Sequence, residues 1–189
     1  MPNWPDIVYG LYGAWRLARL DRGGMAFFDR TVEGFWRSFF AAALVAPGYI
    51  IVVVADLATH ESDSGWLRIL LVHACAYTLS WVAYPVAVHP ICEAVNRQNA
   101  YIGFIIAFNW AKVIQMAVYL PVIGITALEI LPSGMTASLN GFVYVLLLGY
   151  QWFVTRTALD LRPLAAVGLV ALDLIIGIVI NALVLGMIR

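Results

Sequence analysis

The sequence is poor in charge and in cysteine, and it lacks catalytic motifs. Charged residues make up 12% of the chain, whereas an ordinary soluble domain carries about a quarter. Cys75 falls within a predicted span and Cys92 on its cytoplasmic side, so we expect no disulfide and interpret both as packing residues. No GxSxG, P-loop, HExxH or dinucleotide-binding glycine pattern occurs. We therefore expect no enzyme, no catalytic residue and no cofactor.

A metal site is not expected either. His89, Cys92 and Glu93 stand within one helical turn, but no further ligand follows at a spacing that metal sites use. An intramembrane enzyme that acts on lipid ranks third among the functions we consider, after lateral contact and transport. It is considered because His73 and Asp173 could do acid/base work. Nothing places a nucleophile beside them.

What the sequence has in abundance is long apolar runs. Hydrophobic residues make up 63% of the chain. A helix needs roughly 20 residues to cross a hydrocarbon core of about 30 Å, and five runs reach that length. They lie at about 36–58, 66–89, 100–131, 137–157 and 163–188. The sequence therefore predicts an all-α fold: a polytopic transmembrane bundle of five spans at 35–189, preceded by an interfacial amphipathic helix.

The third run is too long for one straight crossing. Pro121 interrupts it, so we expect a span near 100–120 followed by a kink or a short interfacial helix. An alternative places the span at about 113–131 and moves Lys112 to the cytoplasmic interface.

The segment 1–34 is predicted to be cytoplasmic and to contain the amphipathic helix. Apolar residues recur there at helical spacing, and arginines lie off that stripe. The stripe comprises Ile7, Val8, Leu11, Tyr12, Trp15 and Ala18, and the residues expected to meet the membrane surface are Arg16, Arg19, Arg22 and Arg30. Such a helix recruits a lipid or a protein partner, or it is a plain interfacial anchor.

Charge placement predicts the orientation. The arginines that precede the first span favour a cytoplasmic N-terminus, and five crossings then put the C-terminus outside. The connections on the far side carry His60, Glu61, Asp63 and Glu129, which the rule tolerates there. The first residues lack the features of a signal peptide. Ten arginines against one lysine suggest a GC-rich genome, so we expect a bacterial inner (cytoplasmic) membrane.

Polar residues inside the spans are the candidate functional residues. Unsatisfied polar groups in lipid cost several kcal/mol each, so these side chains should turn inward and form one polar seam. The predicted seam comprises His73, Tyr77, Tyr84, Asn109, Lys112, Gln115, Tyr144, Gln151, Asp173 and Asn181.

Two charges dominate that seam. Counted from the starts of their spans, Lys112 lies about 18 Å deep and Asp173 about 15 Å deep, so the two should pair. The pair either fixes the register of the helices or belongs, with His73, to a path for an ion, a proton or a polar solute.

A cytoplasmic N-terminal segment followed by five closely spaced spans resembles the layout of the Yip1 family of small membrane proteins. The resemblance covers about residues 30–189, and the acidic, Gly-Pro-containing N-terminal motif of that family has no clear match. It implies a non-enzymatic role in membrane organisation or in assembling partners.

The predicted function is accordingly lateral contact with protein or lipid. A small oligomeric transporter or channel that uses Lys112, Asp173 and His73 is the alternative. The expected partners are the lipid bilayer and other membrane proteins or further copies of the chain, and no nucleic acid.

Overall fold

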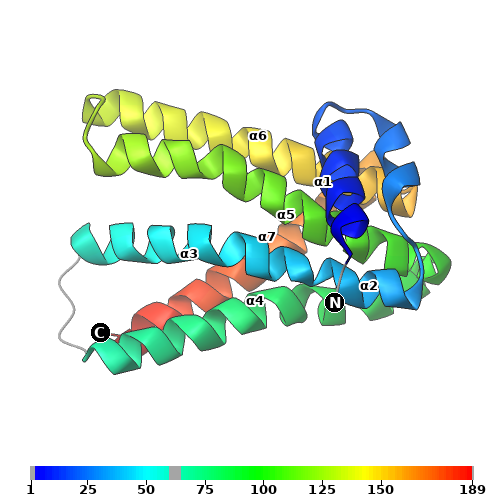
Figure 1. The fold of residues 1–189 in the computed structure, drawn as a ribbon, viewed down its shortest axis with the longest axis horizontal. Coiled ribbons are helices and arrows are strands. Elements are labelled where there is room, and N and C mark those ends of the chain that lie inside the picture. Colours follow the sequence, from blue (N-terminus) through cyan, green and yellow to red (C-terminus); the bar gives the residue numbers. More distant parts are fainter. Residues whose placement is uncertain (1–2, 60–64, 189) are drawn as a thin grey trace.

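The structure, a computed structural model, describes residues 3–59 and 65–188, and over these residues it contains helices and no strand (Figure 1). The elements are α1 (Trp4–Ala18), η1 (Arg22–Phe27), α2 (Val32–Ser38), α3 (Phe40–Thr59), α4 (Trp66–Ala94), α5 (Gln98–Ala127), α6 (Ser133–Leu159) and α7 (Pro163–Ile188). The predicted all-α fold is confirmed. His60, Glu61, Asp63 and Arg189 lie outside the described residues.

Among the described residues, five segments are long and apolar enough to cross a membrane. They are Val32–Leu57, Trp66–Ala94, Gln98–Ala127, Ser133–Leu159 and Pro163–Ile188. Each overlaps one predicted run. The third run forms one helix of 30 residues, α5, with Pro121 inside it. It ends at Ala127, short of the predicted Leu131, and Glu129 (φ 49°) then turns the chain through the left-handed region toward α6.

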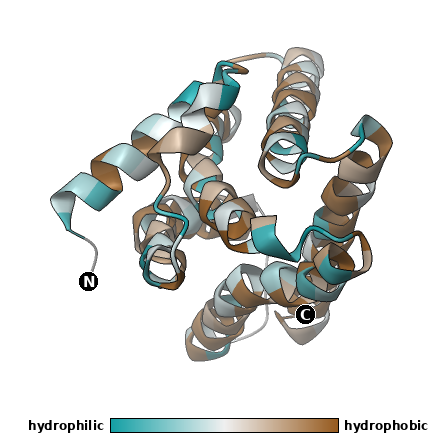
Figure 2. Cartoon of the chain, turned by 90° about the vertical axis from the view of Figure 1, so that its right-hand side faces the viewer, coloured by the Kyte–Doolittle hydropathy of each residue, from teal (hydrophilic) through white to brown (hydrophobic). Residues whose placement is uncertain are grey.

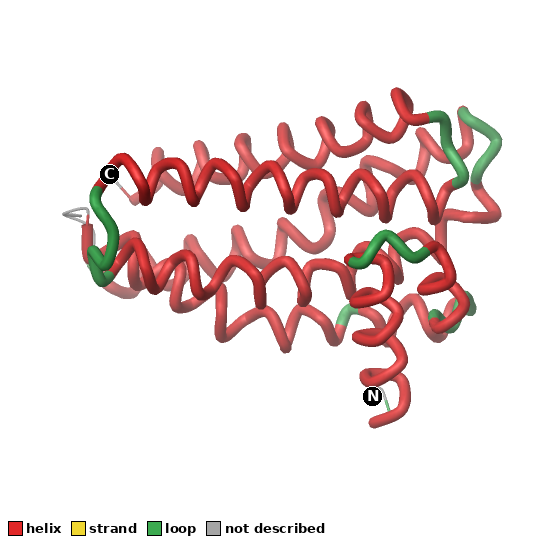
Figure 3. The backbone as a smooth tube through the Cα atoms, turned by 90° about the horizontal axis from the view of Figure 1, so that it is seen from above, coloured by secondary structure: helices red, strands yellow, loops and turns green. Residues whose placement is uncertain are grey.

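The long helices run side by side (Figures 1 and 3), and α5 contacts most of the other elements. It packs against α1, α2, α3, α4 and α6, while α7 packs against α4 and α6. Residues 103–111 of α5 are all buried. The two larger hydrophobic clusters surround this stretch, and a third, smaller cluster of Val72, Ala76, Val184 and Ile188 joins α4 to α7 near the opposite end. The bundle is therefore packed most densely at the end that carries α1.

Helix α1 lies across the long helices, and its N-terminal end projects beyond the flank of the bundle (Figure 2). Its buried face consists of small residues and one leucine: Gly10, Gly13, Ala14 and Leu17. Of the predicted apolar stripe, Ile7 and Leu11 pack partly against the core, whereas Val8, Tyr12 and Trp15 stay exposed together with Trp4. Small residues therefore make up most of the docked face of α1, and the aromatic residues of the stripe lie outside it.

Candidate functional site

The predicted polar seam divides into separate groups. One group lies on the α3/α4 side, a second is buried in the core, and a third lines a groove between α5, α6 and α7. The third group contains half of the predicted residues: Gln115, Tyr144, Gln151, Asp173 and Asn181.

The groove between α5, α6 and α7 has a volume of about 420 Å³. Apolar residues complete its wall, namely Leu147, Leu148, Leu174, Gly177 and Ile178. Gln151 is buried at its base and donates a hydrogen bond of 2.7 Å from Nε2 to Oδ2 of Asp173. Asp173 and Asn181 stand eight residues apart on α7, so both lie on the same helix face. The groove therefore presents a carboxylate, three amides and a phenol among apolar walls.

Lys112 does not form the predicted ion pair with Asp173. Its ammonium group donates a hydrogen bond of 3.3 Å to the carbonyl of Ser80 in α4. It also lies 4.9 Å from the ring centroid of Trp81 and 4.7 Å from that of Phe108, distances at which a cation is attracted to an aromatic face. Lys112 thus points toward α4, whereas Asp173 points toward Gln151 on α6.

His73 and Tyr77 lie apart from these charges. Nδ1 of His73 is 3.2 Å from the hydroxyl of Tyr49 in α3, and the Tyr77 hydroxyl donates to the carbonyl of Ala42. All three rings line an apolar groove of about 490 Å³ between α3 and α4. His73 is therefore not brought together with Lys112 and Asp173, and Tyr49 is a partner that the sequence did not indicate.

Tyr84 and Asn109 are buried core residues. The Tyr84 hydroxyl donates to the carbonyl of Leu169 at 3.2 Å and so links α4 to α7. Nδ2 of Asn109 donates to the hydroxyl of Ser38 at 2.9 Å, and Ser38 donates to the carbonyl of Phe35. These contacts join α2 to α5. Tyr84 and Asn109 thus form hydrogen bonds that hold neighbouring helices together.

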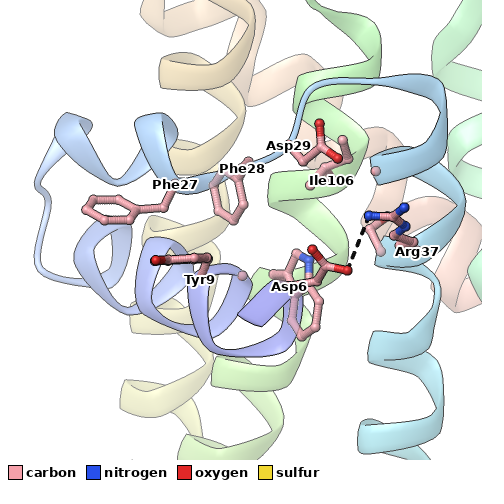
Figure 4. Close-up of a pocket in the computed structure, with 11 residues that line it drawn as sticks. Asp6, Tyr9, Phe27, Phe28, Asp29, Arg37 and Ile106 are labelled. Atoms are coloured by element: carbon pink, nitrogen blue, oxygen red, sulfur yellow. Dashed lines mark hydrogen bonds and ion pairs between the residues drawn. The ribbon is translucent and has the colours of Figure 1, made fainter. Parts of the chain in front are cut away.

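A small pocket forms where α1, η1, α2 and α5 meet (Figure 4). Its volume is about 70 Å³, far below the 300–1,000 Å³ of typical ligand sites, and it has room for water. Arg37 reaches across it to Asp6 at 3.3 Å, and Tyr9 faces Phe27 and Phe28 over it. The pocket is part of the joint that holds α1 in place.

The four basic residues predicted at the membrane surface have different surroundings. Arg16 forms an ion pair with Asp21 and lies 5.2 Å from the Phe27 ring centroid, and Arg19 lies 4.8 Å from that of Trp15. Arg22 is exposed at the start of η1. Arg30 donates to the carbonyl of Met25 at 2.9 Å, which gives it a role in the η1 turn.

Over the part of the chain that the structure describes, no three His, Cys, Asp or Glu side chains gather as metal ligands would. Comparison with known proteins finds no family model, no curated protein and no solved structure that matches the chain. The resemblance to the Yip1 layout therefore stays a prediction, and a function has to be inferred from the groove and from α1.

Proposed function

We propose that this chain is a non-enzymatic integral membrane protein that works through lateral contacts with protein or lipid. The observation that carries the proposal is the groove between α5, α6 and α7. Its polar residues lie on the flank of helices long and apolar enough to span a membrane, and Tyr144 is 48% exposed there. Because polar groups in hydrocarbon need hydrogen-bond partners, a flank of this kind favours a bound partner.

The placement of α1 supports an interfacial helix. Tyr9 and Tyr12 contact Phe27 of η1. Trp4, Val8 and Trp15 are exposed and form an apolar side opposite the buried face of the helix. Since α1 lies across the long helices, this apolar side can enter the membrane surface with its arginines in the headgroup layer. We place this end of the bundle in the cytoplasm of a bacterium and the protein in the inner membrane.

The arrangement of the polar groups favours this function over transport. A path for an ion or a polar solute needs polar side chains that follow one another across the membrane. His73 lines the groove between α3 and α4, whereas Asp173 lines the groove on the other side of α5. The buried stretch 103–111 of α5 fills the space between the helices at the α1 end.

Site-specific photocrosslinking in native membranes tests the proposal. A photoreactive residue in place of Tyr144 or Ile178, in the groove, should crosslink to a defined protein or lipid. The same residue in place of Val86, which is exposed on α4 outside the groove, is the control and should crosslink only to bulk lipid. Equal labelling at all three positions would count against lateral recognition. If the protein carried a proton or solute flux into liposomes and Asp173→Asn abolished that flux, transport would replace lateral contact as the function.

A further inference from the structure

We infer that the groove between α5, α6 and α7 binds a transmembrane helix of a different protein, and that this helix carries a lysine or an arginine that pairs with Asp173. The inference rests on the proposed function and names the kind of partner. The charge of the groove, its shape and the depth of Asp173 each favour such a partner.

The groove has a negative charge and no positive one. Asp173 is the only charged residue among those that line it. Gln151 hydrogen-bonds the carboxylate but is neutral. Lys112 attracts Asp173 electrostatically, but its ammonium contacts the Ser80 carbonyl and two aromatic rings and makes no direct contact with the carboxylate. A carboxylate within a membrane-spanning segment is costly without an opposite charge. The directly contacting cation is therefore supplied from outside the chain.

The shape of the groove suits a helix. Asp173, Gly177 and Asn181 follow one another at intervals of four residues, so they line about 12 Å of the α7 surface. A β-carbon at Gly177 would meet no atom within 4 Å, and a neighbouring backbone can approach closely at such a position. Asn181 lies about two turns beyond Asp173 on α7, and Tyr144 lies about two turns before Gln151 on α6, so both offer hydrogen bonds along the groove.

Depth distinguishes a helix from a lipid headgroup. Asp173 lies ten residues beyond Pro163, which places it about 15 Å from the nearer end of α7. The ammonium group of a lipid lies in the headgroup layer, whereas a basic residue on a transmembrane helix can stand at any depth.

A second copy of the chain does not supply the cation. In a parallel pair of copies, Asp173 would meet residues of about its own depth in the other copy, and none of the described ones is a free cation. The only lysine, Lys112, is engaged inside the bundle. The arginines of the described long segments stand near helix ends, at Arg37, Arg68 and Arg156.

Host peptides in liposomes test the inference with defined probes. One is a leucine-rich transmembrane peptide with a single central lysine, and the other has methionine in its place. Energy transfer from the labelled full-length protein to the labelled peptide reports binding. We expect the lysine peptide to bind the wild-type protein about tenfold more tightly than the methionine peptide. Asp173→Asn should remove this preference, and Asp173→Glu should keep it.

The matched control is Glu129→Gln, which removes an exposed carboxylate outside the groove and should leave the preference unchanged. Helix content and thermal stability of each variant establish that it is folded. Equal binding of the two peptides by the wild-type protein would overturn the inference, and so would a preference that survives in Asp173→Asn. Loss of the preference in vesicles rich in phosphatidylethanolamine would assign the groove to a lipid amine.

Energy transfer between two labelled copies of the protein reports self-association. If this transfer depended on Asp173, the groove would be assigned to self-association and the inference would be overturned. The proposed function can survive each of these results, because crosslinking at Tyr144 reports lateral contact of any kind. A flux that depends on Asp173 is the result that removes the proposed function.

Discussion

The indole ring of Trp110 in α5 occupies the space that a β-carbon on Gly10 in α1 would need. An added β-carbon would stand 2.3 Å from Cε2 of the ring, and Trp110 is itself buried. Glycine within a helix costs roughly 0.5–1 kcal/mol relative to alanine, so the close contact has to offset that cost. Helix α1 is therefore a packed part of the bundle, held at a position where only glycine fits.

Gly10→Ala should destabilise the protein by about 1–3 kcal/mol, because the methyl group forces α1 away from an immobile ring. Denaturant unfolding in detergent measures the loss. Gly141→Ala in α6 is the matched control, since its β-carbon would meet no atom within 4 Å. The control should be neutral or gain up to about 1 kcal/mol from helix propensity. A neutral Gly10→Ala would mean that α1 does not dock on Trp110.

Tyr150→Phe tests the second tie to α1. The Tyr150 hydroxyl of α6 donates a hydrogen bond of 2.8 Å to the carbonyl of Ala14, and both residues are buried. The substitution removes the hydroxyl, so the Ala14 carbonyl loses this hydrogen bond and the free energy of unfolding should fall by about 1 kcal/mol. Tyr144→Phe removes a hydroxyl that makes no hydrogen bond to a described residue and should have no effect in detergent. Equal effects of the two changes would contradict the predicted tie.

The apolar runs predicted the five long helices well, because a helix of about 20 apolar residues is determined by length and composition alone. The face of α1 that docks was not predictable in the same way. Large apolar residues such as Val8 and Trp15 usually mark a buried face, but here Gly10 and Gly13 make the contact because they allow the helices to approach closely. Only the tertiary arrangement shows which face of a helix has a neighbour.

The candidate site shows the same limit. Equal depth along two spans says nothing about the direction in which their side chains point, and Lys112 and Asp173 point toward different helices. The contact of Tyr49 with His73 could not be predicted, because Tyr49 is one aromatic residue in a uniformly apolar run. Gln151 and Asp173 were both predicted as seam residues, but their hydrogen bond depends on how α6 packs against α7.

Asp21 should make the turn after α1 sensitive to acid. Its carboxylate accepts hydrogen bonds from Arg16 and from the Gly23 amide, and these lower the pKa of Asp21 below its ordinary value of 3.8. A lowered pKa means that the folded state favours the charged form, so the stabilisation is present above pH 3.8 and is lost as the pH falls through the folded value. The protection factor of the Gly23 amide against hydrogen exchange should fall over the same pH range. Asp21→Asn should remove this pH dependence, and an unchanged profile in the variant would rule out Asp21 as its source.

Reporter fusions test the orientation. Arginines near the ends of α5 and α6 that lie on the same side as α1 favour a cytoplasmic location for that end. Fusions after Gln98 and Leu161 should report the cytoplasm, and a fusion after Ser133 should report the outside. A cytoplasmic signal at Ser133 would contradict the predicted crossing by α5.

A double-mutant cycle on Lys112 and Asp173 measures how far the two charges act together. Lys112→Met removes the hydrogen bond to Ser80 and the contacts with two aromatic rings, so it should cost about 1–3 kcal/mol. Asp173→Asn should cost less than about 1 kcal/mol, because the new amide oxygen can still accept the hydrogen bond from Gln151.

Since the two charges do not form a direct pair, their coupling energy should stay below about 1 kcal/mol, whereas breaking a direct buried pair costs about 3–5 kcal/mol. The measurement is the unfolding free energy of the wild type, both single variants and the double variant in one detergent.

Trp81→Leu gives an independent check, because it removes one ring that contacts the ammonium while leaving both charges. It should weaken the effect of Lys112→Met. A coupling of about 3 kcal/mol or more would show that Lys112 leaves Ser80 and pairs with Asp173 directly, which would also neutralise the groove that the partner helix is inferred to need.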